Sequence, residues 1–582
     1  MKLSTHTSRL AMAVTALALG IGALTATSPS QAATSPKPAG SSHAAGPAKP
    51  AAAPRPAAAP RHGPTGNYTG TEYDQGGVTQ PINGPQSSVD ATADNITQVT
   101  NQAVQQVDRD RAQLPYGQIY PDPHAPEQLS TYPAPTGIDP SDQYAVSLRQ
   151  GTQQTSSFVY KVDARKTDTN LEADTSWTSF SFAGPVQVAV QKLAGQATGC
   201  LVRPTTQNIA TTFSNNTCYF TLTKAANISV EFAPDTTNPV LHPMLVFANP
   251  PETGVPPASD PNVLYLGPGI HDLGADVQLH SGETVYIAGG AWVDATFTGT
   301  DLNNVVIKGR GVLDGLFIDT GNQDENKNQP GMIDIADSHN VVVDGITLVD
   351  APRFNVRVLG TDITVHNIKA ISWWYSTDCI WAGNYSLVED NFCKVNDDSL
   401  KPMSGPGVVR DNVVWQLENG APFMISWNIE TNQSYFHVYD NDVIHAEEYF
   451  LSPQAIFRAR HAGAATMSKY LFENIHVEDA NWRLFYIILE DNKWYDPTLG
   501  YGQITDLIFR NITAVTPFTQ PSVIAGVNPQ HEVTNVSISN VYMDGTCADS
   551  AADGNFQIDP STTDQIRIMK STAGGCQNPG TQ

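Results

Sequence analysis

The sequence predicts an all-β protein in which an antiparallel β-sandwich precedes a parallel β-helix. Two observations predict the β-helix. A short motif of β-branched residues that ends near an Asn or a Gly recurs nine times after Pro251, and the intervals between repeats have the size of a coil. The sandwich is predicted by short strand-like runs with period-two alternation between Tyr144 and Phe247.

The repeated motif places a turn residue directly after each predicted strand. Successive turn positions are separated by 36, 22, 24, 21, 29, 33, 37 and 29 residues. Asn and Gly enter the left-handed backbone region at low cost, so we expect the chain to turn there between two strands. Strands of successive coils would then run parallel about 4.8 Å apart, with Val, Ile and Leu filling the cylinder and asparagines stacking as a ladder. The nine positions are Gly309, Gly345, Asn367, Asn391, Asn412, Asn441, Asn474, Asn511 and Asn540.

The remaining organisation follows from changes in composition. Residues 1–32 have basic residues, an apolar run and a small-residue exit, which together predict a secretory signal peptide. Residues 33–66 are rich in Ala and Pro and predict a disordered linker. We expect an N-terminal region with the sandwich over 67–250, with its core at about 144–247, and a β-helical catalytic domain over 251–582. The sandwich is expected to act as a cap and packing partner, with a binding module as the alternative.

Charge and cysteine content narrow the function. Lys plus Arg number 32 and Asp plus Glu 57, so the formal net charge is −25, which disfavours nucleic acid, anionic lipid and polyanionic polysaccharide as partners. All six cysteines follow the predicted signal peptide, and an even count predicts disulfides in an oxidising compartment. We expect sequential pairs, with Cys200–Cys218 the best supported because each lies beside a strand-like run.

Three aspartates within two coils are the candidate catalytic groups. Asp378 lies 13 residues before Asn391, while Asp398 and Asp397 lie 14 and 15 residues before Asn412. Nearly equal offsets predict that these carboxylates lie on neighbouring coils at the same face. Crowded carboxylates raise each other's pKa, so one can stay protonated as a general acid while another acts as a base.

The consecutive pair Asp397-Asp398 requires a bend at the strand end, because neighbours in a regular strand point to opposite faces. Without such a bend, one of the two side chains would point into the core. The alternative interpretation of the pair is turn chemistry or a calcium ligand set. The aligned Asp378 and the surrounding aromatic residues favour catalysis.

Aromatic and basic residues near the aspartates are candidates for substrate binding. Trp374 and Tyr375 precede Asp378 directly, and Lys401 follows Asp398. The same offset applied to the next coil lands on Ser426-Trp427-Asn428, and on the preceding coil it lands on Arg353-Phe354-Asn355. Aromatic faces stack on sugar rings, while Lys401 and Arg353 could hold carboxylates or sugar hydroxyls. The candidate set is Arg353, Trp374, Tyr375, Lys401, Trp427 and Asn428.

The spacing of the aspartates resembles glycoside hydrolase family 49, the dextranases and isopullulanase. That family has one aspartate followed at 19 and 20 residues by an Asp-Asp pair, matched here by Asp378, Asp397 and Asp398. The resemblance spans roughly 144–546 and implies a β-sandwich joined to a right-handed single-stranded parallel β-helix. It also implies that Asp397 is the general acid and that Asp378 and Asp398 are bases that activate water for inversion.

These observations together predict a secreted, monomeric, inverting glycoside hydrolase that cleaves α-1,6 links in dextran by endo action. No metal ion or other cofactor is expected, and the partner is a neutral α-glucan. The alternatives are an isopullulanase-type hydrolase, a polygalacturonase-like hydrolase, a β-helical lyase on uronic acids and a non-catalytic glycan-binding solenoid. Segment Ser376-Thr377-Asp378-Cys379 differs from the Asn-Thr-Asp-Gly of polygalacturonases, and the sequence indicates no cluster of Arg and Lys near the acids to receive a uronate.

Overall fold

The computed structural model describes the chain from residue 85 to residue 570, together with Cys576. Short segments within that range are not described, namely 134, 164–173, 238, 319–328, 448–452 and 544. The predicted signal peptide and linker lie outside the described residues, as do 67–84. All described residues belong to the unit that spans 70–582.

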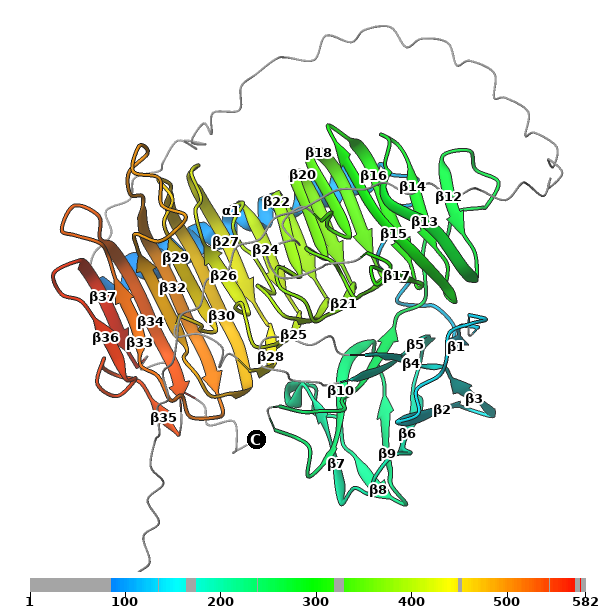
Figure 1. Cartoon of the computed structure of the whole chain (residues 1–582). Coiled ribbons are helices and arrows are strands. Elements are labelled where there is room, and N and C mark those ends of the chain that lie inside the picture. The colour runs from blue at the N-terminus through cyan, green and yellow to red at the C-terminus, as the bar shows by residue number, and fades with distance from the viewer. Residues whose placement is uncertain are drawn as a thin grey trace, which may run out of the picture. The chain divides into compact units, whose positions relative to one another are not determined.

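Two packed sheets form the N-terminal β-sandwich (Figure 1). One sheet has the order β3 (Gln153–Ser157), β2 (Tyr144–Gln150), β6 (Val186–Lys192), β9 (Thr217–Leu222), β8 (Thr212–Ser214). The other has the order β1 (Gln128–Thr131), β5 (Thr175–Ala183), β11 (Met244–Asn249), β10 (Ala226–Ala233), β7 (Gly199–Arg203), with β4 (Val159–Val162) paired to β5. A one-turn 3-10 helix, Thr205–Gln207, follows β7.

The inner faces of these sheets form one apolar core because the strands alternate. In β2, Tyr144, Val146 and Leu148 are buried while Ser147 and Arg149 are exposed. The predicted antiparallel pairing holds for every pair in the described sandwich except β5 with β11, which run parallel. The predicted disulfide Cys200–Cys218 is present and joins β7 to β9, one strand from each sheet.

The chain after the sandwich winds into a parallel β-helix, whose successive coils lie side by side in Figure 1. Its main sheet consists of β12 (Val263–Leu266), β13 (Gly269–Gln278), β14 (Thr284–Ile287), β15 (Ala291–Thr300), β16 (Asn303–Gly309), β17 (Val312–Asp314), β18 (Ile333–Asp344), β19 (Thr347–Val349), β20 (Val356–His366), β21 (Lys369–Ser372), β22 (Ile380–Glu389), β23 (Phe392–Val395), β24 (Gly407–Arg410), β25 (Val413–Gln416), β27 (Gln433–Tyr439), β28 (Asp442–Ala446), β30 (Thr466–Ala480), β32 (Gln503–Ala514), β34 (Val533–Met543), β35 (Thr546–Cys547) and β37 (Thr563–Met569). A second sheet consists of β26 (Phe423–Ser426), β29 (Phe457–His461), β31 (Phe485–Leu489), β33 (Ser522–Ala525) and β36 (Phe556–Ile558).

Equivalent residues of successive coils stack inside the cylinder. The parallel register pairs Val343 with Val365, Val365 with Val388, Val388 with Val409 and Val409 with Val438. All five valines belong to the apolar core of the β-helix. Each fully buried valine contributes about 1.5–3 kcal/mol relative to exposure, so the repeated β-branched motif is the main source of stability along the axis.

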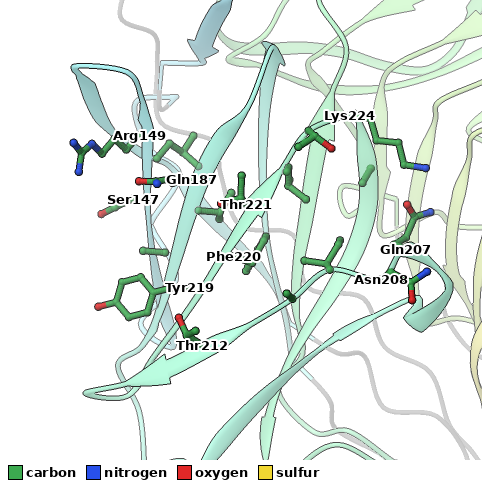
Figure 2. A pocket seen from close by; sticks show the side chains of 18 of the residues that line it. Ser147, Arg149, Gln187, Gln207, Asn208, Thr212, Tyr219, Phe220, Thr221 and Lys224 are labelled. Carbon is green, nitrogen blue, oxygen red and sulfur yellow. The ribbon is translucent and has the colours of Figure 1, made fainter. Parts of the chain in front are cut away.

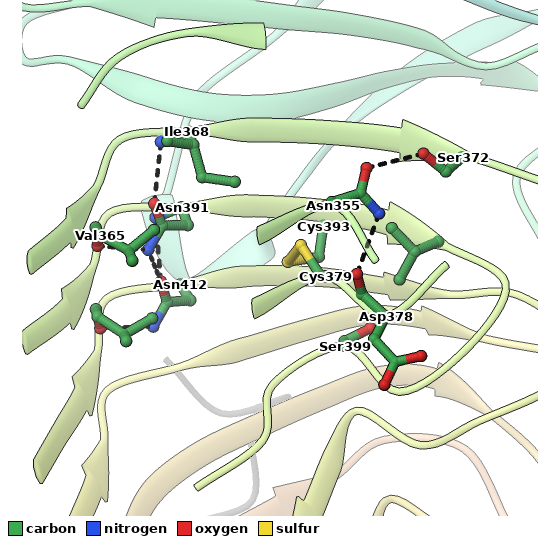
Figure 3. The surroundings of a disulfide bond; sticks show 12 residues. Asn355, Val365, Ile368, Ser372, Asp378, Cys379, Asn391, Cys393, Ser399 and Asn412 are labelled. Carbon is green, nitrogen blue, oxygen red and sulfur yellow. Dashed lines mark hydrogen bonds between the residues drawn. A yellow bond between two sulfur atoms is a disulfide. The ribbon is translucent and has the colours of Figure 1, made fainter. Parts of the chain in front are cut away.

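An asparagine ladder runs along one corner of the β-helix, as predicted (Figure 3). The backbone N–H of Asn391 donates to Asn412 Oδ1 at 3.0 Å, and that of Asn412 donates to Asn441 Oδ1 at 3.0 Å. The side-chain amides also donate along the ladder, Asn391 to Asn412 and Asn412 to Asn441, each at 2.9 Å. Because all three side chains are buried, these bonds satisfy polar groups that would otherwise be costly.

The prediction that these three asparagines themselves make the left-handed turn is wrong. The left-handed residues are Asp390, Asp411 and Asp440, with φ of 58°, 56° and 53°, each directly before a ladder asparagine. The turn residue needs only a side chain that tolerates a left-handed backbone, whereas the next residue must fill the buried corner with both a donor and an acceptor. At the other coils, such as those of Asn367 and Asn474, the predicted residue is itself left-handed.

Helix α1 (Pro85–Arg111) lies along the outside of the β-helix (Figure 1). It covers apolar side chains on the outer face of the strands: Ala93 and Ile96 pack with Leu471 and Ile508. The buried stripe of α1 also includes the polar residues Thr100 and Arg111. Within the described part of the chain, no helix is both long enough and apolar enough to cross a membrane.

Candidate active site

The three predicted aspartates lie at the ends of strands on two neighbouring coils. Asp378 comes two residues before β22, and Asp397 and Asp398 follow β23. A parallel bridge between Ile380 and Leu400 places Asp378 level with Asp398 on the next coil. The next residue after Asp378 is Cys379, which belongs to the apolar core, so Asp378 faces away from that core.

A bend after β23 allows both members of the aspartate pair to reach the site. The strand ends at Val395, and the backbone bends at Asn396 and Asp397. The next coil approaches this bend closely at Gly420, where an added Cβ would lie 2.3 Å from the carbonyl carbon of Asp397. The φ of Gly420 is +87°, so both its conformation and its contact require a glycine.

Lys401 connects two of the carboxylates. Its ammonium forms an ion pair and hydrogen bond with Asp378 Oδ2, and it lies 3.5 Å from Asp398 Oδ2. Burial would lower the pKa of Lys401, but attraction by Asp378 and Asp398 outweighs this and raises the pKa to about 12. Lys401 is therefore a permanent positive charge between the two coils.

Asp397 has different partners. Its Oδ2 accepts hydrogen bonds from the backbone N–H of Ser376 at 2.9 Å and from Asn419 Nδ2 at 3.0 Å. Its Oδ1 accepts the backbone N–H of Asp398 at 2.9 Å. These donors occupy three of the four acceptor positions of the carboxyl group, so one position on Oδ1 remains for a proton.

The pKa is raised to different extents in Asp397 and Asp378. Burial, followed by repulsion from Asp378 and Asp398, raises the pKa of Asp397 well above that of an ordinary aspartate. Burial also raises the pKa of Asp378, but the charge of Lys401 opposes the rise. Asp397 is partly exposed, whereas Asp378 and Asp398 are only 5% and 1% exposed. Asp397, whose pKa is raised more than that of Asp378, is thus also the most accessible of the three carboxyl groups.

A buried disulfide anchors the chain directly after Asp378. Cys379 is bonded to Cys393 of β23, 14 residues along the chain, and both side chains lie in the core (Figure 3). The backbone carbonyl of Asp378 accepts a hydrogen bond from Asn355 Nδ2 at 3.1 Å. The covalent bond and the hydrogen bond fix the position of Asp378 from two neighbouring elements.

Counting residues back from the corner asparagine predicts the correct neighbour of the aspartates on the coil before them, but not on the coil after them. Val356 pairs with Ile380, so Phe354 is level with Asp378, as predicted. On the next coil, however, Leu400 bridges to Phe423, which makes Ala421 rather than Trp427 level with Asp398. The two coils differ in the number of residues between the corner and the site, which counting from the corner asparagine cannot reveal.

Trp427 nevertheless contacts Asp398. Its Nε1 donates to Asp398 Oδ2 at 3.2 Å, and the guanidinium of Arg458 lies 4.9 Å from its ring centroid. Asn428 is exposed directly after it. Arg458 also lies 3.9 Å from Asp398 Oδ1. The expectation that no basic cluster would surround the acids is therefore wrong, although Lys401 and Arg458 are paired with the site's own carboxylates.

The other predicted binding residues, Trp374, Tyr375 and Arg353, are all partly exposed. The rings of Trp374 and Tyr375 pack edge to face with centroids 6.0 Å apart. The guanidinium of Arg353 lies 4.5 Å from the ring centroid of Phe354. Burial is the main cause that lowers the pKa of Arg353, and the attraction of Asp378 opposes it.

Several site residues were missed in the sequence. Asn419 holds Asp397, and its Oδ1 accepts a hydrogen bond from Gln454 Nε2 at 3.0 Å. Gln454 in turn accepts a hydrogen bond from Arg458. Trp381 lies beneath Lys401, with the ammonium 5.0 Å from its ring centroid. Only Trp381 is close in sequence to the aspartates, and Asn419, Gln454 and Arg458 come from later coils whose register depends on loop lengths.

One group among the described residues has the composition of a metal site. Ligand atoms of Asp110, His339 and Asp362 lie within 4.8 Å of one another where α1 meets the β-helix. Asp362 already accepts a hydrogen bond from Gln106 and pairs with His339 at 3.0 Å. These contacts explain why the three side chains lie together: they join α1 to the β-helix.

Comparison with known proteins connects this geometry to two groups of carbohydrate enzymes. The model of the family "Glycosyl hydrolases family 28" matches residues 270–416, a segment that contains all three aspartates. The dextranase of Arthrobacter sp. (strain CB-8) is 26% identical over 213 residues, which is 32% of this chain and 33% of the relative. The dextranase of Arthrobacter globiformis is 27% identical over the same length. This chain resembles the dextranases.

The chain matches these curated dextranases over only a third of their length. The solved structure of Dex49A from Penicillium minioluteum has a TM-score of 0.61 and 18% identity, covering 76% of this chain and 96% of that one. The right-handed parallel β-helix with an N-terminal sandwich is thereby confirmed as the fold, and the resemblance to the dextranases inferred from the sequence is confirmed as well.

Proposed function

We propose that this protein is a secreted glycoside hydrolase that cleaves the α-1,6 links of dextran with inversion and by endo action. The observation that carries the proposal is the meeting of Asp378, Asp397 and Asp398 at one face, where burial and the two neighbouring carboxylates raise the pKa of Asp397. The similarity to two dextranases supports the choice of dextran among neutral glucans. Three disulfides are consistent with folding in an oxidising compartment outside the cytoplasm.

In the proposed reaction, Asp397 gives its proton to the glycosidic oxygen as the C–O bond breaks. Asp378 and Asp398 accept a proton from the water that attacks the anomeric carbon from the opposite side, which inverts its configuration. Lys401 pairs with Asp378 and lies 3.5 Å from Asp398, whereas Asp397 is held by the hydrogen bonds that it accepts from Ser376 and Asn419. The low exposure of the bases strengthens these electrostatic effects.

The substrate class is tested by incubating the full-length purified protein with dextran, pullulan and polygalacturonate. We expect new reducing ends from dextran, with large oligosaccharides appearing first. Release from pullulan and silence on dextran would favour an isopullulanase-type activity. Release from polygalacturonate alone would refute the neutral substrate, and this arm is needed because Lys401 and Arg458 lie beside the acids. NMR of the first product distinguishes inversion from retention at the anomeric carbon.

The role of the acid is tested with Asp397→Asn. A general acid contributes about 10²–10⁴-fold to the rate, so kcat should fall by at least about 100-fold. The matched control is Asp301→Asn, because Asp301 is exposed and left-handed with φ of 57°, a conformation that asparagine tolerates. Equal activity of the two variants would refute the role of Asp397.

A further inference from the structure

The outer face of the sandwich carries a large cavity of its own. It has a volume of about 840 Å³ and is formed by the solvent side of the sheet β3-β2-β6-β9-β8 together with the segment after β7 (Figure 2). That volume lies in the range of pockets that bind small molecules or short polymer segments. None of the cavity's lining residues belongs to the candidate active site.

The lining side chains form two rows across the strands. The antiparallel register pairs Arg149 with Gln187 and Gln187 with Thr221, which makes a row of hydrogen-bonding groups. The neighbouring row pairs Ser147 with Ala189 and Ala189 with Tyr219. Because Ser147 and Ala189 are small, the second row is a shallow trough beside the ring of Tyr219, which in turn pairs with Thr212 of β8.

Tyr219 is the exposed aromatic residue of this trough. Its side chain is 41% exposed, although the residues before and after it in β9 are buried. The adjacent disulfide Cys200–Cys218 ties β9 to β7 of the facing sheet, so the ring stands on a rigid strand. An exposed ring beside hydroxyl and amide groups offers the two contacts that a sugar needs, stacking on its apolar face and hydrogen bonds to its hydroxyls.

The charge of the cavity also restricts its ligand. The chain has a net charge of −25, yet among the residues that the structure describes no Asp or Glu lines the cavity, and only Arg149 and Lys224 carry charge there. Hydrogen-bonding residues such as Gln154, Gln187 and Thr221 outnumber these two cations. This composition suits a neutral polyhydroxylated chain better than a polyanion, whose repeating charges would need more than two cations.

We infer that this outer face is a second glucan-binding site, separate from the active site, which holds a neutral α-glucan segment against Tyr219, Gln187 and Arg149. The inference rests on the proposed function for its substrate class. Such a site would keep the enzyme on a polymer between cleavage events, because a second point of attachment raises the effective concentration of substrate at the first.

The test measures retention of the protein in native gels that contain dextran. All variants carry Asp397→Asn so that the polymer is not degraded. Adding Tyr219→Ala should weaken dextran affinity by roughly 2- to 10-fold, the loss expected for one aromatic contact. Gln187→Ala should weaken it by roughly 2- to 10-fold as well, the loss expected for one hydrogen bond. The matched control is Gln191→Ala, which lies on the same strand and the same side as Gln187 but outside the cavity. Near-UV circular dichroism reports whether each variant is folded.

A second measurement separates this site from the active site. With Asp397 intact, Tyr219→Ala should leave kcat/KM on short isomalto-oligosaccharides unchanged and lower the rate on particles of cross-linked dextran. Unchanged retention in Tyr219→Ala, in a protein whose parent hydrolyses dextran, would overturn the second site and leave the proposed function standing. Tyr219-dependent retention in a parent that does not hydrolyse dextran would support the site and contradict the proposed function. Tighter retention by dextran sulfate than by dextran would overturn the neutral ligand.

Discussion

Gly420 offers a sharp test of how the site is built, because this glycine of the next coil lies directly against the backbone of the aspartate pair. A Cβ at position 420 would lie 2.3 Å from the carbonyl carbon and 2.7 Å from the Cα of Asp397, and 2.5 Å from the backbone N of Asp398. These atoms are backbone and cannot rotate away. Gly420→Ala should therefore displace the bend that presents both carboxylates.

The magnitude follows from two separate costs. Alanine at a φ of +87° costs about 1–2 kcal/mol relative to glycine. Forcing a methyl group into a close-packed contact costs about 1–3 kcal/mol more. We expect the free energy of unfolding to fall by about 2–5 kcal/mol, and kcat to fall at least about tenfold because Asp397 loses its position relative to Asn419 and Ser376.

Gly282→Ala separates the two costs. Gly282 has a φ of +80°, close to that of Gly420, but nothing lies within 4 Å of its added Cβ. Any effect of the substitution on the unfolded chain is common to both variants. Gly282→Ala should cost only the backbone part, about 1–2 kcal/mol, and should keep full activity. The measurements are urea unfolding followed by tryptophan fluorescence and the initial rate on dextran.

Equal stability and equal activity of the two alanine variants would refute the reasoning, because the close approach at Gly420 would then have no energetic consequence. A loss of stability in Gly420→Ala with unchanged kcat would show that the aspartate pair is positioned from another direction.

Three further predictions concern pH, the ladder and the disulfide. Burial and two neighbouring carboxylates raise the pKa of Asp397, so kcat/KM should stay high at pH values where an exposed aspartate is already ionised. The value of kcat/KM should fall only as the pH rises through the raised pKa. A pH profile whose alkaline limb lies near pH 4 would contradict this prediction. Asn412→Ala removes the buried hydrogen bonds to Asn391 and Asn441 and should lower the free energy of unfolding, measured with urea, by about 2–4 kcal/mol. A loss below about 1 kcal/mol would contradict a structural role for the asparagine ladder. Replacing Cys379 and its partner by alanine opens a link across 14 residues and should cost about 3 kcal/mol, measured by urea unfolding, whereas unchanged stability would contradict a stabilising role for this disulfide.

The fold could be predicted because its signals are local. Each coil needs a β-branched strand and a residue that turns, and both are visible in a window of a few residues around positions such as Asn391. The error at the corner had a local cause as well. Asp390 and Asn391 both tolerate a turn, and only the hydrogen bonds of the ladder decide which residue turns and which stacks.

The candidate site was predictable only in part. Asp378, Asp397 and Asp398 lie within two coils that contain no long insertion between them, so counting residues places them together. Counting fails for the next coil, where Ala421 is level with Asp398 and Trp427 is not. Trp427 reaches Asp398 because its side chain extends from the end of β26, which no offset in the sequence encodes.

By itself, the sequence determined that strands would stack as coils and that three carboxylates would meet, since both depend on the spacing of residue types along a short stretch of chain. The tertiary structure alone decided the proton affinities and the partners of those carboxylates. Lys401 is near them in sequence, but its contact with two coils, the support of Asp397 by Asn419 and the approach of Gly420 depend on how coils of unequal length come into register. Electrostatic and steric effects act over a few ångströms in space, so they depend on which residues of neighbouring coils lie side by side.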